Sequence, residues 1–316
     1  MSESRVGATP GRKDEGRAAS SWRQSLGRRA LTAVVLIPIV IALVFFGGWV
    51  AFAGTLVALL ISFSELRAMF LHRGWHPLIV LGAAFGVAAL VGARVLVLAP
   101  HALGTVLVIA GAAVSALLVL VFGWLILTRR SLDGIVVDWA LTLAGAFYLG
   151  WPMACFLLLR GDALGAANVG FWWLLALFFM TWANDTFALL SGHYFGRGGI
   201  HPLSPVISPK KTWEGFIGGL VFTVIAAFVF LLVLPGAFHQ PIPHLGPVDA
   251  AIIGVLVAIA ATIGDLAESL LKRGTGVKDS GTIVPGHGGL LDRMDSLLFV
   301  VFVVFFYAAY LHALPF

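Results

Sequence analysis

Long apolar runs, separated by short polar segments, occupy most of this chain from residue 30 onward. A transmembrane helix needs about 20 predominantly apolar residues, and nine runs come near that length. They cover residues 30–47, 49–64, 78–98, 103–128, 135–159, 169–194, 213–235, 249–271 and 291–314. The run 49–64 is the shortest, so we expect it to be the weakest span, re-entrant or tilted. The pattern predicts an all-α, polytopic integral membrane protein with about nine transmembrane helices.

Residues 1–29 differ from the rest of the chain because they are polar and have no apolar periodicity, which predicts a disordered tail. Arg28 and Arg29 before an apolar run resemble the start of a signal peptide. The polar lead is too long for one, however, and many more spans follow, so we expect a retained first helix. The expected organisation is a cytoplasmic tail at 1–29, N-terminal transmembrane helices at 30–168 and a C-terminal transmembrane catalytic region at 169–316.

Composition supports the membrane class, since 60% of the residues are hydrophobic and 11% are charged. Soluble domains are about half apolar and a quarter charged. A net charge of +5 would suggest nucleic acid in a soluble chain. In a membrane protein the same positive charge is explained by the basic residues that set the orientation of the spans and by their attraction to anionic lipid headgroups. We therefore expect no nucleic-acid partner. The single cysteine, Cys155, excludes an intrachain disulfide and a multi-cysteine metal site.

The basic residues indicate how the spans are oriented. If the N-terminus is cytoplasmic, every Lys and Arg except Arg94 and Arg160 lies on the cytoplasmic side, as the positive-inside rule predicts. The same orientation places the loops 196–212 and 272–291 in the cytoplasm, where nucleotides are available. We therefore expect both the N-terminus and the active site to be cytoplasmic.

Acidic residues gather in the cytoplasmic halves of three predicted spans, and these residues are Asp185, Asp265, Glu268, Asp292 and Asp295. Asp265, Glu268 and Lys272 follow i, i+3, i+7 and share one helical face, as do Asp292 and Asp295. Carboxylates alone would repel a phosphorylated substrate, so basic residues beside them indicate a bound Mg²⁺ that takes oxygen ligands from protein and phosphate. Taken singly, each has a structural explanation; Asp292, for example, suits a helix N-terminus.

A second basic segment, 208–215, opens the run 213–235. Ser208 is a candidate N-cap, with Pro209 at the first helical position. A helix N-terminus carrying Lys210 and Lys211 could hold a pyrophosphate. The same features also describe an ordinary capped helix with lysines at the membrane surface.

The stretch 269–295 adds a glycine-rich loop, in which Gly286, Gly288 and Gly289 surround His287 and would let the backbone approach a ligand closely. This stretch resembles the signature of the phosphatidate cytidylyltransferase family, also called CDP-diacylglycerol synthases. The matching positions are Ser269, Lys272, Arg273, Lys278, Asp279, His287, Gly288, Gly289, Asp292, Arg293 and Asp295. Asn184-Asp185 with Gly196, and the segment 208–215, are similar to further patterns of the family.

The resemblance implies an all-helical fold, a homodimer in the bacterial inner membrane, and a reaction of CTP with phosphatidate that gives CDP-diacylglycerol and pyrophosphate. The attacking phosphatidate oxygen is already ionised, so charge neutralisation and in-line alignment matter more than a general base. One or two Mg²⁺ ions would be held by Asp265 and Asp292, with Asp185 or Asp295 completing or supporting the site. The expected catalytic residues are Asp265, Lys272, Asp292 and Asp295.

The remaining signature residues are expected to bind the substrates. Lys210 and Lys211 would hold the leaving pyrophosphate, and His287 would contact substrate within the glycine loop. The other expected substrate-binding residues are Ser208, Ser269, Arg273, Lys278, Asp279, Gly288, Gly289 and Arg293.

Two alternative functions stay open. A related CTP-dependent enzyme could cytidylylate or phosphorylate an isoprenoid lipid instead. A cation-coupled transporter would also place carboxylates in membrane helices, although nearer the midplane than one surface. A CDP-alcohol phosphatidyltransferase is excluded because its D-G-x-x-A-R…G-x-x-x-D-x-x-x-D pattern is missing from the sequence.

Overall fold

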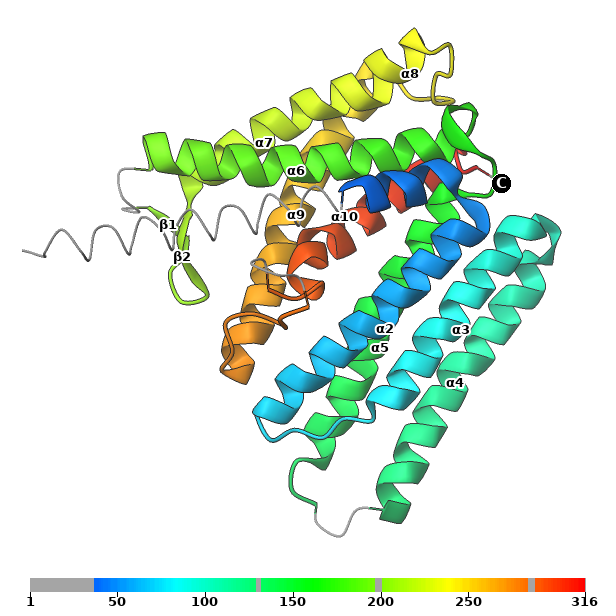
Figure 1. Cartoon of the computed structure of the whole chain (residues 1–316), viewed down its shortest axis with the longest axis vertical. Coiled ribbons are helices and arrows are strands. Elements are labelled where there is room, and N and C mark those ends of the chain that lie inside the picture. Colours follow the sequence, from blue (N-terminus) through cyan, green and yellow to red (C-terminus); the bar gives the residue numbers. More distant parts are fainter. Residues whose placement is uncertain (1–36, 129–131, 197–200, 284–287, 316) are drawn as a thin grey trace, which may run out of the picture.

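The computed structural model describes residues 37–128, 132–196, 201–283 and 288–315, and within them the protein is almost entirely helical (Figure 1). Eight helical segments of the described chain are long and apolar enough to cross a membrane. They comprise α2 (Gly48–His72), α3 (Ile79–Leu98), α4 (Leu103–Thr128), α5 (Ile135–Arg160), α6 (Val169–Phe195), α7 (Trp213–Ala227) with its continuation to Ala237, α9 (Pro247–Thr275) and α10 (Leu291–Tyr310). The expectation of an all-α, polytopic membrane protein is confirmed.

Short elements complete the described chain. The single-turn helices η1 (Pro100–Ala102) and η2 (Gly165–Ala167) precede α4 and α6, and the π-helical turn η3 (Phe228–Val233) joins α7 to α8 (Leu234–Ala237). The first expected span, 30–47, lies partly outside the described residues, and its described part forms the short helix Ile37–Phe46.

Helix α2 corrects the expectation of a short span at 49–64. It is a continuous helix of 25 residues, from Gly48 to His72. The apolar pattern breaks at Glu65, but this side chain is only 3% exposed and lies inside the protein instead of ending the helix. A buried carboxylate can continue a helix when other parts of the chain supply its hydrogen bonds.

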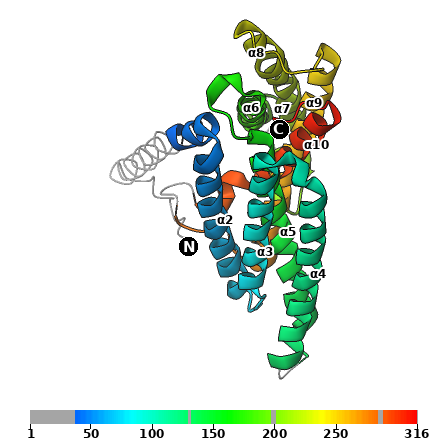
Figure 2. The same cartoon turned by 90° about the vertical axis from the view of Figure 1, so that its right-hand side faces the viewer.

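The helices form two groups with different directions. Helices α2, α3, α4 and α5 run side by side, whereas α6 and α7 lie across them, so that α6 is seen along its length in Figure 1 and end-on in Figure 2. Helix α10 joins the two groups. In its first half, Leu291 and Leu298 pack into the core of α2, α3 and α5. Further along, Val300 and Val304 pack with α6 and α9, so the N-terminus of α10 lies where the groups meet.

A small hairpin replaces the expected start of the helix at 208. Strands β1 (Pro202–Ser204) and β2 (Ser208–Thr212) are antiparallel, with Ser204 paired to Ser208. The helix α7 begins only at Trp213, and Thr212 is its N-cap, accepting a hydrogen bond from the Gly215 amide at 3.1 Å. The expectation that Ser208 caps this helix is therefore wrong. A proline at position 209 disfavours helix at Ser208 and is tolerated in an edge strand.

The two arginines expected on the far side of the membrane, Arg94 and Arg160, are both buried and bonded. Arg94 Nη1 donates to Asp162 Oδ1 at 2.7 Å, and its guanidinium lies 4.6 Å from the centroid of the Trp49 ring. Arg160 donates to the backbone carbonyls of Val44, Phe45 and Ala163. Both side chains therefore tie helix ends together.

Candidate functional site

A cavity of about 1190 Å³ opens where α6, β2, α9 and α10 come together. Eight of the residues predicted from the sequence line it, and these are Asp185, Lys210, Lys211, Asp265, Lys272, Asp292, Arg293 and Asp295. The remaining wall includes apolar side chains of α6 and α10, among them Phe178, Trp182, Leu189 and Leu297. The cavity thus combines a charged wall with an apolar one.

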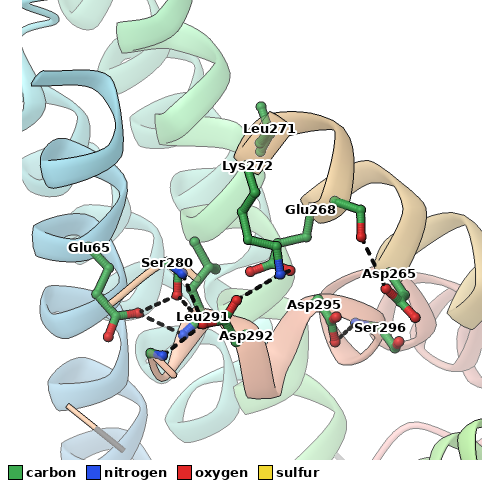
Figure 3. Close-up of polar contacts among 12 residues, drawn as sticks. Glu65, Asp265, Glu268, Leu271, Lys272, Ser280, Leu291, Asp292, Asp295 and Ser296 are labelled. Atoms are coloured by element: carbon green, nitrogen blue, oxygen red, sulfur yellow. Dashed lines mark hydrogen bonds and ion pairs between the residues drawn. The ribbon is translucent and has the colours of Figure 1, made fainter. Parts of the chain in front are cut away.

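Lys272 lies between two carboxylates (Figure 3). Its Nζ donates to Asp292 Oδ1 at 2.7 Å and forms an ion pair with Glu268, one turn earlier on α9. The side chains of Glu268 and Asp292 are 0% and 4% exposed. Buried charges are tolerated when they are paired, so one lysine compensates two acids that α9 and α10 bring together.

The second oxygen of Asp292 is held by the loop that precedes α10. Asp292 Oδ2 accepts hydrogen bonds from the Ser280 amide at 2.9 Å, the Ser280 hydroxyl at 3.0 Å and the Gly289 amide at 2.7 Å. Gly288 has φ +86° and lies so close that a Cβ would be 2.4 Å from this oxygen. In this structure the close approach that the glycine loop allows is to carboxylates of the protein.

Glu65 is the acidic residue of this region that sequence reasoning missed. Its Oε1 accepts from the Leu290 amide at 2.9 Å, and its Oε2 accepts from the Leu291 amide at 2.8 Å and the Ser280 hydroxyl at 3.3 Å. It lies on α2, more than 200 residues away in sequence, so no local spacing connects it to the loop. The available signal was weak, because Glu65 directly follows the expected span 49–64 and Arg67 comes two residues later, as in an ordinary polar helix end.

Three further carboxylates share the cavity and face the basic strand β2. Asp185, Asp265 and Asp295 line the cavity from α6, α9 and α10 respectively. Lys211 forms an ion pair with Asp265, and the Ser269 hydroxyl lies 3.5 Å from Asp265 Oδ1. Like charges in one cavity repel each other, and Lys211 offsets part of that repulsion.

The donor chemistry of this wall fits Mg²⁺, because carboxylate oxygens are the ligands this ion takes from proteins. Within the described residues, however, no three His, Cys, Asp or Glu side chains already converge as a ligand set. An ion would have to draw Asp185, Asp265 and Asp295 closer together. Asp292 could join them through Oδ1, by sharing this oxygen with Lys272 or by exchanging Lys272 for the ion, since Oδ2 already has three donors. The metal ligands therefore stay a prediction.

The remaining expected residues lie in different places. Ser208 starts β2, and Gly289 is buried beside Asp292 and Glu65. Arg273, Lys278 and Asp279, all within the described chain, are exposed and do not line the cavity. His287 lies outside the described residues. The substrate contacts expected of these residues stay predictions.

Comparison with known proteins matches this site to a family. The sequence pattern of the cytidylyltransferase family covers residues 27–311 of this chain, which include Glu65 and every lining residue named above. The chain belongs to the cytidylyltransferase family. This cytidylyltransferase is therefore a nucleotidyltransferase, and its apolar helices make it a multi-pass membrane protein. This family assignment excludes the alternative of a cation-coupled transporter.

Proteins similar to this chain in sequence include three bacterial proteins, each named phosphatidate cytidylyltransferase. The protein of Staphylococcus haemolyticus (strain JCSC1435) is 32% identical over 274 residues, which cover 86% of this chain and 95% of the relative. The protein of Staphylococcus aureus (strain COL) is 33% identical over 273 residues, with the same shares. The protein of Brucella abortus biovar 1 (strain 9-941) is 37% identical over 168 residues, 52% of this chain and 56% of the relative.

Proposed function

We propose that this cytidylyltransferase transfers the cytidylyl group of CTP to phosphatidate, giving CDP-diacylglycerol and pyrophosphate. The names of relatives that cover 86% of the chain support this substrate pair. The observation that supports the proposal best is the cavity itself, because Lys210, Lys211 and Arg293 line it together with apolar side chains of membrane helices.

The size and lining of the cavity suit two substrates of different polarity. Ligand pockets usually enclose about 300–1,000 Å³, and this cavity, at about 1190 Å³, is larger. Lys210, Lys211 and Arg293 offer positive charge to the phosphates of CTP and phosphatidate. Phe178 and Leu297 offer apolar surface to acyl chains. A soluble nucleotide and a lipid can therefore bind next to each other in the same cavity.

The reaction needs charge neutralisation and alignment. A phosphatidate oxygen attacks the α-phosphorus of CTP, a new P–O bond forms, and the bond to the β-phosphate oxygen breaks with its electron pair leaving on pyrophosphate. No proton has to be removed from the nucleophile near neutral pH. Lys272 and Arg293 would hold the reacting phosphates, and Lys210 with Lys211 would hold the departing pyrophosphate. Held in line by these cations, the two substrates react as though in one molecule.

One or two Mg²⁺ ions would supply further neutralisation of phosphate charge when bound. Asp265 and Asp292 would hold the metal, with Asp185 or Asp295 completing or supporting the site. Lys211 forms an ion pair with Asp265, and both side chains line the cavity.

The setting proposed for this reaction is the bacterial inner membrane, with the N-terminus and the cavity on the cytoplasmic side. The support is the positive-inside distribution and the need for cytosolic CTP. The two basic residues that fall on the other side, Arg94 and Arg160, are buried and bonded within the protein. A homodimer is proposed from the family resemblance.

An acceptor competition tests the proposed substrate. Purified protein would be incubated with labelled CTP and either phosphatidate or an isoprenoid lipid, such as an ether-linked phosphatidate analogue or a polyprenol, in mixed micelles. We expect a labelled CDP-lipid with phosphatidate and much less product with the isoprenoid acceptors. Product with an isoprenoid lipid alone would assign this cytidylyltransferase to that substrate class instead.

A further inference from the structure

We propose that Glu65 of α2 is a positioning residue that fixes the start of α10, and with it the direction in which Asp292 faces Lys272. The proposal rests on the proposed function and deepens it, because it adds a residue from the N-terminal helices to those that position the reacting groups. Glu65 does not line the cavity formed by the described residues. It therefore acts through its neighbours and touches no substrate in this geometry.

The carboxylate of Glu65 caps a helix to which it does not belong. The first N–H groups of a helix have no partner within it, and Leu290, the N-cap of α10, has no side-chain hydrogen bond to offer them. Glu65 accepts from the Leu290 amide at 2.9 Å and from the Leu291 amide at 2.8 Å. A negative charge at this end is also favoured by the helix dipole.

A single hydroxyl connects Glu65 to the charged pair. The Ser280 hydroxyl lies 3.3 Å from Glu65 Oε2 and 3.0 Å from Asp292 Oδ2, so its one hydrogen is shared between the two carboxylates. Asp292 in turn accepts from Lys272 at 2.7 Å. The path from α2 to the cavity is thus Glu65, Ser280, Asp292 and Lys272, with a hydrogen bond at each step (Figure 3).

Two glycines make room for this carboxylate. A Cβ added at Gly281 would lie 2.7 Å from Glu65 Oε1, and one added at Gly289 would lie 2.6 Å from Oε2. A carbon atom cannot lie so close to an oxygen atom, so a side chain at either position would displace the Glu65 carboxylate. The carboxylate would then lose its hydrogen bonds to Leu290, Leu291 and Ser280. The glycine pattern of the loop and the carboxylate of α2 therefore depend on each other.

A second contact from the same face of α2 holds the other end of the loop. His72, seven residues after Glu65, has its Nδ1 3.1 Å from the carbonyl oxygen of Thr275 at the end of α9. Glu65 holds the loop where α10 begins, and His72 holds it where α9 ends. Helix α2 thereby fixes the spacing between the two helices that carry Asp265, Lys272 and Asp292.

The first test is steady-state kinetics on purified full-length Glu65→Ala and Glu65→Gln, with Ser64→Ala as the matched control. Ser64 is the neighbouring residue of α2 and is exposed, and its hydroxyl donates to the Ile61 carbonyl of the same helix at 2.7 Å. We expect kcat to fall roughly 10- to 100-fold in Glu65→Ala, as for other groups that orient reacting residues. The KM values for CTP and phosphatidate should change by less than about threefold, and Glu65→Gln, which keeps one acceptor oxygen, should lie between. A kcat of Glu65→Ala within about twofold of wild type would overturn the proposal.

The second test uses Gly281→Ala as a steric probe of the same contact. In the wild-type background the added methyl group displaces the Glu65 carboxylate, so kcat should fall. In the Glu65→Ala background the methyl group meets no carboxylate and should cost little further. Independent effects in the two backgrounds, with the losses simply multiplying, would contradict the dependence of glycine and carboxylate on each other.

Hydrogen exchange separates this proposal from the choice of substrate. In detergent or nanodiscs, Glu65→Ala should accelerate amide exchange over residues 288–295, while Ser64→Ala should match wild type and the far helices should be unchanged in both. This result is independent of turnover, so it stands even if the enzyme uses another lipid acceptor. Unchanged protection at the start of α10 would show that Glu65 does not hold it.

Discussion

Lys272 Nζ lies 2.7 Å from Asp292 Oδ1, so a lysine from the end of α9 meets an aspartate from the first turn of α10. The same lysine forms an ion pair with Glu268. This group of two acids and one lysine lies at the edge of a cavity whose expected ligands are phosphates. Such a group can act on phosphate only if a cation shares the carboxylates or the lysine changes partner.

Replacement of Lys272 should affect both stability and turnover. Lys272→Ala leaves Glu268 and Asp292 buried without their counter-charge, and breaking a buried pair costs roughly 3–5 kcal/mol. We expect a lower apparent Tm and loss of detectable activity. Lys272→Arg should restore much of the Tm but not full activity, because a planar guanidinium differs from an ammonium in reach and donor direction.

A double variant separates the two roles of this lysine. Lys272→Met with Glu268→Gln removes the base and one acid together, so most of the Tm should return while turnover stays absent. Thermal unfolding and CDP-lipid formation on the same preparations provide the comparison. Recovery of wild-type activity by the double variant or by Lys272→Arg would reduce Lys272 to a structural counter-charge.

The predicted metal ligands give a second test. Asp265→Asn and Asp292→Asn should each lower turnover by more than about 100-fold, since changes around metal ligands alone cost 10–100-fold. Asp249→Asn, at the other end of α9 and bonded to Tyr307 and Gly246, is the matched control and should keep its activity. Mn²⁺ binding followed by electron paramagnetic resonance should weaken in both site variants. Unchanged Mn²⁺ affinity in either one would remove that residue from the ligand set.

The lysines of β2 should differ in effect. Lys211 forms an ion pair with Asp265, whereas Lys210 lines the cavity in an exposed position. Lys210→Ala should mainly raise the KM for CTP and weaken product inhibition by pyrophosphate. Lys211→Ala should do the same and also lower kcat, because it changes the surroundings of Asp265. Equal effects of the two variants on kcat would argue against the importance of that ion pair.

Topology can be tested with single cysteines in a Cys155→Ala background. Val206, in the turn of the β hairpin, and Thr282, in the loop before α10, are exposed and should be labelled only from the cytoplasmic side. Gln240, exposed after α8, should be labelled only from the outside. Gly281 is unsuitable as a probe because a side chain there would meet Glu65. The reverse labelling pattern at all three positions would invert the proposed orientation.

Local patterns in the sequence predict much of this structure. The apolar runs locate the transmembrane helices because length and composition alone decide whether a segment can cross a bilayer. The i, i+3, i+7 spacing places Asp265, Glu268 and Lys272 on one face, and in the structure Asp265 and Lys272 line one cavity. These features depend on residues within a few turns of each other.

Features that depend on distant parts of the chain could not be predicted in this way. The contact of Glu65 with Ser280 and α10 crosses more than 200 residues and the expected boundary at residue 168. The start of α7 moved from Ser208 to Trp213 because β1 pairs with β2, an interaction that the helix signals of Ser208 and Pro209 do not reveal. In the sequence, Arg94 and Arg160 are only the two basic residues that do not lie on the cytoplasmic side, and the fold shows their buried partners.

The most direct test of the proposed reaction follows the two ends of the CTP phosphate chain. Purified wild-type protein would be incubated with phosphatidate, Mg²⁺ and CTP labelled either at the α- or at the γ-phosphate, and the lipid and aqueous phases would then be separated. The account predicts that the α-label enters a CDP-lipid while the γ-label stays in water as pyrophosphate. Both the lipid labelling and the pyrophosphate release should be lost in Asp292→Asn. A γ-label in the lipid would indicate phosphorylation by CTP, and no label in any lipid beside an active control enzyme would contradict the proposed function.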